Sequence, residues 1–293
     1  MKVALTGATG FIGSHILTEL QARGHEVTAF VRSDAEADTV SAHGARPAVA
    51  DLYDSAAVAS VFSSADGAIH TASPGDATSA AMDSAVVDAA IGAFDGTGKP
   101  YLHIGGLWDY GSNRDITEES PVNAPAMMSW REPIADRVLD ASQMRGVVIT
   151  AGVAYGDGGG GVPRLLLGSP RDDAGYLTML GTGQQHWATV HVADIADVFC
   201  RALEDDSAYG RYVVGNGVAS TAGELTEAAA VAAGAPGAVP GSDDEARARL
   251  GRDFADVLLL DQGTEAARAR AELGWNPSHP SLADEFLHGS YRE

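Results

Sequence analysis

A glycine-rich turn near the start of the chain restricts the fold more than any other segment. A short apolar run at residues 3–5 is followed by Gly7, Gly10 and Gly13, and then by a helix-like pattern. The first two glycines let the backbone approach a pyrophosphate, and the third lets the following helix lie close to a sheet. The N-terminus of that helix then faces the phosphates. The segment predicts a buried strand, a dinucleotide-binding turn and a helix, in that order.

Short apolar runs alternate with helical patterns through the first half of the chain. Because parallel strands are joined by right-handed crossovers, this alternation predicts a parallel sheet with helices on both faces. We expect strands at residues 3–6, 27–31, 47–50, 67–71, 100–104 and 146–150. We expect helices at residues 12–23, 55–63, 79–93 and 130–143.

The pattern loosens after Tyr155, where residues 156–161 are five glycines and one aspartate. No Lys-Ser or Lys-Thr follows this run, so we interpret it as a mobile connection or lid and not as a phosphate loop. Further helices are expected at residues 221–233 and 243–250. Residues 1–155 and 188–217 are assigned to a dinucleotide-binding domain, and residues 156–187 and 218–293 to a smaller substrate-binding lobe.

Composition restricts the partners of the chain. The formal net charge is −21 and the sequence pI is near 4.6, whereas nucleic-acid and anionic membrane surfaces require clustered Lys and Arg. We therefore expect neither a nucleic acid nor a membrane as a partner. The chain shows no signal-peptide pattern and no apolar run of about 18 residues, which predicts a cytoplasmic protein. Cys200, the one cysteine, lies in an amphipathic helical pattern and is interpreted as a core thiol.

Six short segments, spread over nearly the whole chain, carry a resemblance to a known family. They are Asp51-Leu52, residues 70–73, Tyr110-Gly111, Tyr155-Gly156, residues 190–196 and residues 273–277. Together with the glycine-rich turn they resemble the NAD-dependent epimerase/dehydratase family, the extended short-chain dehydrogenase/reductases. The resemblance implies an α/β fold with a doubly wound parallel Rossmann sheet, helices on both faces, and a smaller C-terminal lobe for a small-molecule substrate. It also implies a homodimer that pairs through the helices at residues 79–93 and 130–143.

The end of the second expected strand indicates which dinucleotide is bound. NAD enzymes place a carboxylate there for the ribose 2′-hydroxyl, whereas this chain has Val31 followed by Arg32 and Ser33. An arginine and a hydroxyl suit a 2′-phosphate, so NADP(H) is predicted. A solvated Arg32 beside Asp34 and Glu36 is the alternative, which leaves NAD(H) open.

The resemblance also implies a set of cofactor-binding positions. Asp51 and Leu52 would flank the adenine, although Asp51 has an alternative interpretation as a carboxylate that starts a loop. Residues 71–73 would line the stretch from the pyrophosphate to the ribose. The full set is Gly7, Thr9, Gly10, Phe11, Ile12, Gly13, Arg32, Ser33, Asp51, Leu52, Thr71, Ala72, Ser73, Gly105 and Gly106.

The residues that assist hydride transfer in this family are missing from the chain. In the family a tyrosine exchanges the proton, a lysine lowers the pKa of that tyrosine, and a serine holds the carbonyl oxygen. The aligned positions here are Gly106 for the serine, Met128 for the tyrosine and Glu132 for the lysine. No tyrosine lies between residues 110 and 155, and no lysine follows residue 99. No other register therefore restores the tyrosine and the lysine.

Three neighbouring residues are candidates for the missing chemistry. Arg131 would stabilise a developing oxyanion, Glu132 would be a general acid if burial raises its pKa, and Trp108 would donate through its indole. Packing is the alternative for Trp108, and a helix start is the alternative for Arg131 and Glu132. The nine histidines show no metal-ligand spacing, so no metal is expected. Candidate substrate contacts are Trp108, Met128, Val153, His186 and Trp187, with packing an equal alternative for the last two.

Two classes of function follow from these patterns. The first is an NADP(H)-dependent oxidoreductase that reduces a small carbonyl, enone or imine compound with a non-standard proton donor. The second is a non-catalytic NADP(H)-binding sensor or regulatory protein. The missing residues favour the sensor, whereas an intact C-terminal lobe with a polar, tryptophan-bearing pocket favours the oxidoreductase. A sugar-nucleotide epimerase or dehydratase is a weaker alternative, because such an enzyme uses the tyrosine as its base.

Overall fold

A parallel sheet forms the centre of the molecule. The computed structural model describes residues 1–292, and within this range seven strands form the main sheet: β1 (Lys2–Thr6), β2 (Glu26–Val31), β3 (Arg46–Val49), β4 (Gly67–His70), β5 (Pro100–Gly106), β6 (Arg145–Ala151) and β10 (Gly210–Val214). Their order is β10-β6-β5-β4-β1-β2-β3, and all neighbouring pairs are parallel. The doubly wound α/β fold predicted from the sequence is confirmed. The glycine-rich turn follows β1, where the strand order reverses and ligands of such sheets bind.

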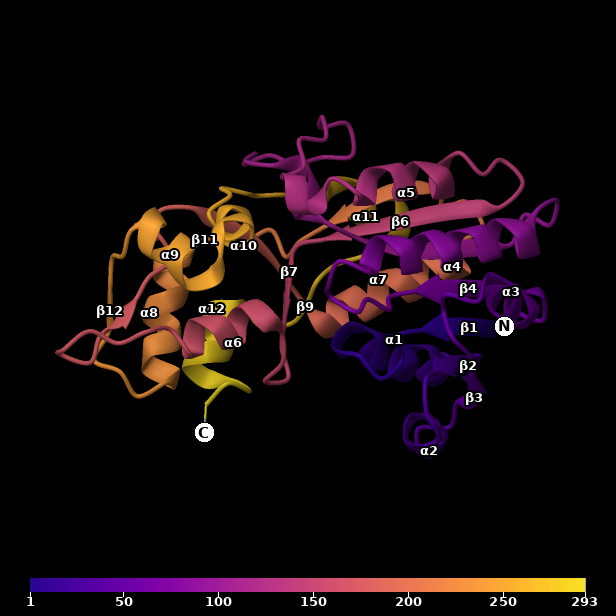
Figure 1. The fold of residues 1–293 in the computed structure, drawn as a ribbon, viewed down its shortest axis with the longest axis horizontal. Helices are drawn as coiled ribbons and strands as arrows, with labels where there is room; N and C mark the ends of the chain where they lie inside the picture. The colour runs from indigo at the N-terminus through magenta and orange to yellow at the C-terminus, as the bar shows by residue number, and fades with distance from the viewer. Residues whose placement is uncertain (293) are drawn as a thin grey trace.

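Helices cover both faces of this sheet (Figure 1). One face carries α1 (Phe11–Ala22), α7 (Val192–Glu204) and α11 (Ala267–Leu273), which share one apolar core with the strands. Cys200 of α7 is buried in that core. The other face carries α3 (Ser55–Ser63), α4 (Ser79–Phe94) and α5 (Arg131–Leu139) over a second core. Because both faces are covered, the central strands are apolar and buried along nearly their whole length.

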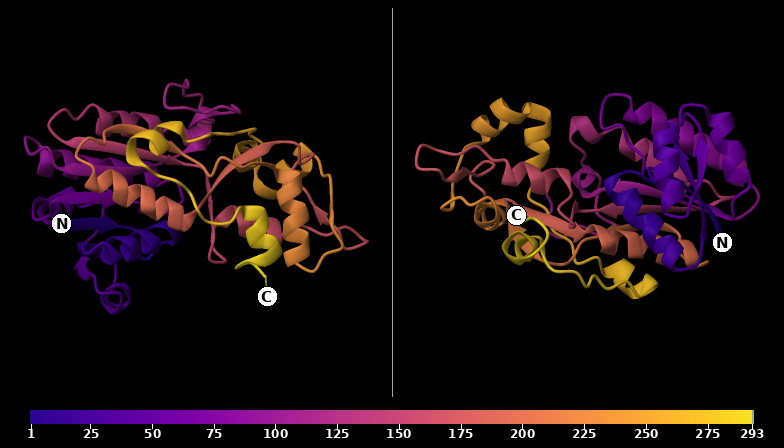
Figure 2. Two further views of the ribbon diagram at one scale, coloured as in Figure 1. Left: turned by 180° about the vertical axis from the view of Figure 1, so that it is seen from behind. Right: turned by 90° about the horizontal axis from the view of Figure 1, so that it is seen from below.

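Most of the other elements form a smaller lobe beside the sheet, as the views in Figures 1 and 2 agree. A three-stranded sheet and a two-stranded sheet lie in this region, with their own apolar core. The strands are β7 (Val153–Tyr155), β9 (His186–His191) and β11 (Ala219–Thr221), with β8 (Leu177–Thr178) paired to β12 (Ala238–Val239). The helices are α6 (Gly161–Leu167), α8 (Ala222–Ala232), α9 (Asp243–Leu250), α10 (Arg252–Leu258) and α12 (Leu282–His288).

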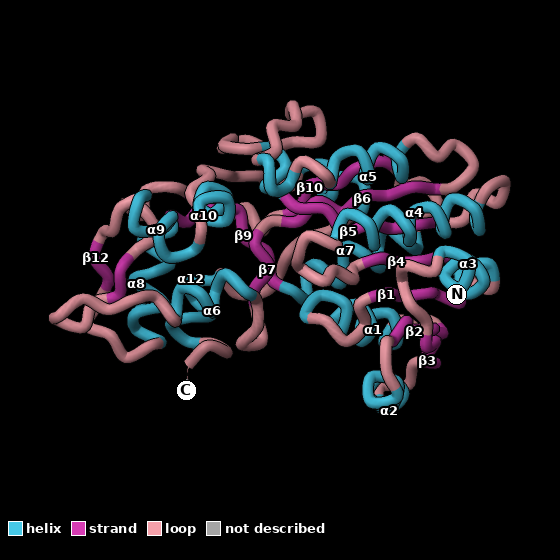
Figure 3. Tube along the Cα trace, in the orientation of Figure 1, coloured by secondary structure: helices cyan, strands magenta, loops and turns pink. Residues whose placement is uncertain are grey.

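Two short 3-10 helices follow β5 and precede α5. They are η1 (Leu107–Tyr110) and η2 (Ala126–Met128), and the segment between them is a loop in Figure 3. No helix within residues 1–292 combines the length and the apolar character that crossing a bilayer would need.

Several helices differ from the prediction: α10, α11 and α12 were not expected, and two further differences have a visible cause. The helix expected over residues 130–143 ends at Leu139, and the backbone carbonyl of Gln143 instead accepts a hydrogen bond from the Gly98 N–H at 3.1 Å. The second difference is α2 (Asp34–Ala42), which was not expected because Val40 is its one buried residue and its apolar pattern is weak. Ser33 caps α2 by accepting a hydrogen bond from a backbone N–H of its first turn. In both cases the local hydrophobic pattern is weak, and contacts with other parts of the chain determine whether the segment is helical.

Candidate cofactor and reaction site

The glycine-rich turn joins β1 to α1 and fits a dinucleotide. Gly7 has a φ of +76°, a conformation that favours glycine. A Cβ at Gly13 would lie 2.0 Å from the Gly7 carbonyl oxygen, so α1 approaches the turn too closely for a side chain. Gly10 is the N-cap of α1, and no side chain within residues 1–292 caps this end or places an acid in its first turn. The backbone N–H groups of α1 are therefore available to a pyrophosphate.

The segment that follows β4 lies against this turn. Thr6 Oγ1 accepts hydrogen bonds from the backbone N–H groups of Thr71, at 3.2 Å, and Ala72, at 3.4 Å. The same oxygen lies 2.6 Å from Nδ1 of the buried His70. A Cβ at Gly7 would be 2.7 Å from the Ala72 nitrogen. The carboxyl ends of β1 and β4 thus hold two predicted cofactor contacts beside the glycine-rich turn.

The residues predicted to select the dinucleotide form an exposed ion pair at the end of β2. The Arg32 side chain is 82% exposed, and its Nη2 donates to Glu36 Oε1 at 2.8 Å. Glu36 Oε2 accepts from the Arg32 backbone N–H, also at 2.8 Å, and these hydrogen bonds lower the pKa of the Glu36 carboxyl. Ser33 uses its hydroxyl oxygen to cap α2. Arg32, which suits the 2′-phosphate of NADP(H), is therefore in direct contact with Glu36, a carboxylate of the kind that suits the 2′-hydroxyl of NAD(H).

Local turns place the predicted contacts to the adenine and ribose. Asp51 Oδ1 accepts a hydrogen bond from the Tyr53 backbone N–H at 3.0 Å, in the turn that leads to α3. Leu52 is half-buried and packs against the core beneath α3 and α4. Ser73 Oγ lies 3.3 Å from Ser79 Oγ, at the start of α4. Asp51 therefore has a structural role in its turn.

The glycine run at residues 156–161 crosses the start of α1 and is held there. A Cβ at Gly159 would lie 2.3 Å from the ring of the first residue of α1. Asp157 Oδ2 lies 2.7 Å from His15 Nε2, and the Tyr291 hydroxyl donates to the Gly159 carbonyl at 2.6 Å. These contacts tie the run to α1 and to the C-terminal segment, so it is not a free connection.

Arg131 occupies the space that the missing serine would need. Gly106 ends β5, and a Cβ at this position would lie 2.7 Å from Arg131 Nη1. Arg131 begins α5, and its guanidinium lies 5.5 Å from the ring centroid of Trp130. A serine at position 106 and this conformation of Arg131 exclude each other. The guanidinium therefore lies at the carboxyl end of β5, next to a glycine.

Two buried polar atoms beside Gly105 and Gly106 lack a hydrogen-bond partner in the described part of the chain. They are Asp109 Oδ1 in η1 and Thr150 Oγ1 in β6. Gly105 is paired with Thr150 in the sheet, and a Cβ at Gly105 would be 3.1 Å from Thr150 Oγ1. Unpartnered buried polar groups are rare in folded proteins, and catalytic sites are one place where they occur.

Asp109 is an acid of this site that sequence reasoning missed. Its residue is 3% exposed, and its Oδ1 lies 3.9 Å from Arg131 Nη1, which is close enough for charge attraction but too long for a hydrogen bond. Burial raises the pKa of the Asp109 carboxyl to about 6, against the opposing effect of Arg131. The one available signal was a charged residue inside the apolar and aromatic segment Leu-Trp-Asp-Tyr.

Glu132 is held in an ion pair that the sequence did not reveal. Both of its carboxylate oxygens accept from Nη2 of Arg211, on β10, at 2.9 Å. Arg211 also lies 5.9 Å from the ring centroid of Tyr110. Both oxygens are engaged by one guanidinium, so the geometry does not support Glu132 as a general acid. A lysine at this position would meet Arg211 with like charge.

Two predicted substrate contacts are used for packing and internal hydrogen bonds instead. Trp187 is 2% exposed and donates its indole N–H to the Leu258 carbonyl at 3.0 Å. Its ring lies within the core of the smaller lobe, which agrees with the packing alternative for this residue. Nδ1 of His186 lies 2.6 Å from Arg114 Nη1 and 2.9 Å from Asp261 Oδ1. Both side chains therefore have structural partners.

The other three predicted substrate contacts lie on segments next to the candidate site. Trp108 is half-buried in η1 and packs edge-on against Phe254 of α10, at 6.4 Å between ring centroids. Met128 is buried at the end of η2, three residues before Arg131. Val153 is half-buried in β7. Their contact with a substrate stays a prediction.

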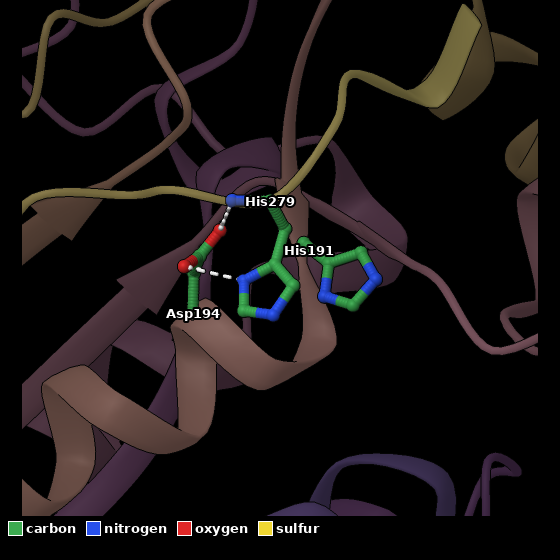
Figure 4. A group of neighbouring side chains, drawn as sticks. All are labelled: His191, Asp194 and His279. Carbon is green, nitrogen blue, oxygen red and sulfur yellow. Dashed lines mark hydrogen bonds and ion pairs between the residues drawn. The ribbon is translucent and has the colours of Figure 1, made fainter. Parts of the chain in front are cut away.

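The fold brings His279 to His191 and Asp194, two residues at the start of α7 that lie far from it in the sequence (Figure 4). One nitrogen or oxygen atom from each lies within 4.8 Å of the others. The two rings stack at 4.3 Å with planes 6° apart, so their in-plane lone pairs run parallel instead of converging on one ion. His191 Nδ1 accepts from the Ala193 N–H and caps α7, while Asp194 Oδ1 lies 2.9 Å from His279 Nδ1. The cluster fastens the C-terminal segment to α7 and lacks the geometry of a metal centre.

Comparisons with known proteins agree with a dinucleotide-binding fold. A family model described as NAD(P)H-binding matches residues 7–98, which include the glycine-rich turn. An uncharacterised protein of Schizosaccharomyces pombe is 27% identical over 304 residues, covering 99% of this chain and 100% of that protein. The 3-diazoavenalumate denitrifying reductase of a Streptomyces species is 28% identical over 323 residues, covering 97% of this chain and 98% of that protein. The crystal structure of human epimerase family protein SDR39U1 with NADPH has a TM-score of 0.75 at 23% identity, covering 99% of each chain, and thus shares the fold.

Proposed function

We propose that the chain is an atypical member of the extended short-chain dehydrogenase/reductase family and that it is an NADP(H)-dependent reductase of a small carbonyl, enone or imine compound. The observation that carries the proposal is the Arg131 guanidinium beside Gly106, in the space that the family's serine would occupy. The chain is similar over nearly its full length to the 3-diazoavenalumate denitrifying reductase, and this similarity supports a reduction as the class of reaction.

NADP(H) is the proposed dinucleotide because Arg32 stands at the end of β2. An arginine suits a 2′-phosphate, and separating it from Glu36 costs little free energy because the pair is exposed. The structure of the human family protein was determined with NADPH, which supports the same choice. Glu36 offers a carboxylate that suits the 2′-hydroxyl of NAD(H). We therefore expect a moderate preference for NADP(H) over NAD(H), set by the Arg32–Glu36 pair.

Arg131 has the chemistry to stabilise the reaction but not to complete it alone. The nicotinamide, when bound, supplies a hydride. Arg131 donates hydrogen bonds to the substrate oxygen or nitrogen and stabilises the negative charge that develops there. An arginine keeps its proton near neutral pH, so it does not deliver the proton that the family's tyrosine provides. The paired Glu132 does not deliver it either, so the proton comes from solvent or from another group.

Oxidation of NADPH in the presence of substrates tests the proposal. The protein is mixed with NADPH and a panel of ketones, enones and imines, and the absorbance of the reduced nicotinamide is followed. For a compound that is reduced, Arg131→Ala should lower kcat/KM by about a hundredfold or more, as loss of one charge-stabilising donor does in comparable sites. Arg137→Ala is the control, since Arg137 lies on the same helix but pairs with Asp88 and Ser84. Equal kcat/KM values for the two variants would contradict the role of Arg131.

A non-catalytic NADP(H)-binding sensor is the second candidate. It is favoured by the glycine, methionine and glutamate that replace the family's serine, tyrosine and lysine. The same panel separates the two functions when NADPH fluorescence is recorded alongside absorbance. Binding without oxidation across the whole panel would favour the sensor and reject the reductase. Failure to bind either NADPH or NADH would reject both.

A further inference from the structure

Asp109 approaches Arg131 from the side of η1. Its Oδ1 lies 3.9 Å from Arg131 Nη1, the same nitrogen that lies 2.7 Å from the Cβ position of Gly106. Oδ1 has no hydrogen-bond partner among residues 1–292, and the side chain is almost completely buried. A single guanidinium nitrogen therefore faces both a buried carboxylate and the side of β5 where the family's serine would stand.

The pairing of Asp109 differs from that of a structural carboxylate in the same protein. Glu132 accepts from Arg211 at 2.9 Å with both oxygens, so its half-buried charge is compensated by hydrogen bonds. The cation next to Asp109 lies beyond hydrogen-bond distance, and the side chain of that cation, Arg131, is 31% exposed. Asp109 therefore attracts the Arg131 guanidinium by charge without holding it in a hydrogen bond. Such a carboxylate favours one orientation of the arginine side chain and still lets it move.

Charged and polar groups from several elements surround Asp109. Burial is the largest influence and disfavours its ionised form, and Glu132 of α5 acts in the same direction. Arg131 of α5, Arg211 of β10 and the Gly106 backbone N–H at the end of β5 favour the ionised form. The balance raises the pKa of Asp109 to about 6, so this carboxyl changes its charge just on the acid side of neutrality.

We propose that Asp109 is a positioning residue whose ionised carboxylate holds the Arg131 guanidinium beside Gly106, where it meets the substrate. The inference rests on the proposed function, in which Arg131 stabilises the charge that develops on the substrate. Protonation of Asp109 removes the attraction, and the partly exposed Arg131 side chain then turns away. Turnover is therefore faster with ionised Asp109 and falls as this one group is protonated.

Nuclear magnetic resonance of the arginine side chains tests the proposal without turnover. In the full chain with NADP+, the Arg131 Nε–H resonance is identified by its loss in Arg131→Lys. We expect this resonance to move with pH in the wild type, with a midpoint close to 6, and to stay constant in Asp109→Asn. Asp115→Asn is the matched control and should keep the wild-type titration, since Asp115 is an exposed aspartate of the neighbouring loop. A constant resonance in the wild type, or an unchanged midpoint in Asp109→Asn, overturns the proposal.

Steady-state kinetics give a second readout once a substrate is known. Wild-type kcat/KM should fall by about tenfold through the titration of Asp109, a loss equivalent to one charge interaction. It should level off at the value of Asp109→Asn, which shows no inflection, and Asp109→Glu should restore the pH dependence. The affinity for NADPH should not follow this titration. An inflection that persists in Asp109→Asn overturns the proposal.

The two readouts separate this proposal from the proposed reductase activity. The resonance titration needs no substrate, so an expected titration with no turnover across the panel rejects the reductase and leaves the coupling of Asp109 to Arg131 in place. Turnover without the titration rejects the positioning role of Asp109 alone.

Discussion

Asp109→Asn is expected to raise the free energy of unfolding at pH 8, although it removes a negative charge from the neighbourhood of Arg131. Burial raises the pKa of Asp109 from 3.8 to about 6, so ionisation costs more free energy in the folded protein than in the unfolded chain. A difference of this size corresponds to roughly 3 kcal/mol at pH 8. Asparagine has nearly the same shape and no charge, so the variant avoids this cost, and roughly 3 kcal/mol is the upper bound of the gain.

The sign of the pH dependence follows from proton binding. Between pH 3.8 and about 6 the folded protein keeps a proton that the unfolded chain releases, so the wild type loses stability as the pH rises through this interval. At pH 5 roughly half of the difference has developed. Urea unfolding followed by tryptophan fluorescence at pH 5 and pH 8 measures both values. Both pH values lie above the sequence pI of 4.6, at which the protein would carry no net charge and would tend to self-associate.

Two results would refute this reasoning. One is an Asp109→Asn variant that is no more stable than the wild type at pH 8, and the other is a gain at pH 5 equal to the gain at pH 8. Asp115→Asn should change the free energy of unfolding by less than about 0.5 kcal/mol at either pH, because Asp115 is exposed. An equal gain in Asp115→Asn would assign the effect to the net charge of −21 and not to burial.

Three further substitutions test the site. Gly13→Ala should abolish NADPH binding in a fluorescence titration, because its Cβ would lie 2.0 Å from a backbone carbonyl oxygen of the turn; an unchanged Kd would show that the turn does not hold the cofactor. Glu36→Gln should lower the Kd for NADPH by about two- to fivefold and raise that for NADH, since Arg32 is released and the carboxylate is lost. Equal shifts for the two dinucleotides would place the pair away from the ribose. Gly106→Ser should lower kcat/KM by about tenfold or more at constant NADPH affinity, because its Cβ would lie 2.7 Å from Arg131 Nη1; an unaltered kcat/KM would count against Arg131 at the substrate.

The elements of the main sheet were predictable where their signals are local. The helix over residues 55–63 has the predicted bounds, because Asp54 caps it and its apolar residues repeat at helical spacing. Six of the seven strands of the main sheet coincide with the predicted runs to within two residues, since strands covered on both faces are continuously apolar, whereas β10 was not predicted. The helix α2 was missed because it buries only Val40, so hydrophobic periodicity carries little information about it. The length of α5 was overestimated. The segment after Leu139 is not helical, and its residue Gln143 bonds to Gly98, which is far away in the chain and is not visible in the local pattern.

The sequence by itself determined the strand, the glycine-rich turn and the helix of the NAD(P)H-binding region. Gly7, Gly10 and Gly13 act through backbone geometry within seven residues of chain, and such local requirements are visible in the order of residues. The loss of the family's tyrosine and lysine was visible in the same way.

Only the tertiary structure decided what takes their place. Glu132 pairs with Arg211 across 79 residues of sequence, and the Arg131 guanidinium lies beside Gly106 because α5 begins next to the end of β5. The perturbed pKa of Asp109 comes from burial, which a short segment of sequence does not specify. Burial and the pairing of charges depend on which distant segments pack together, and for that reason the candidate reaction chemistry appeared only in the folded chain.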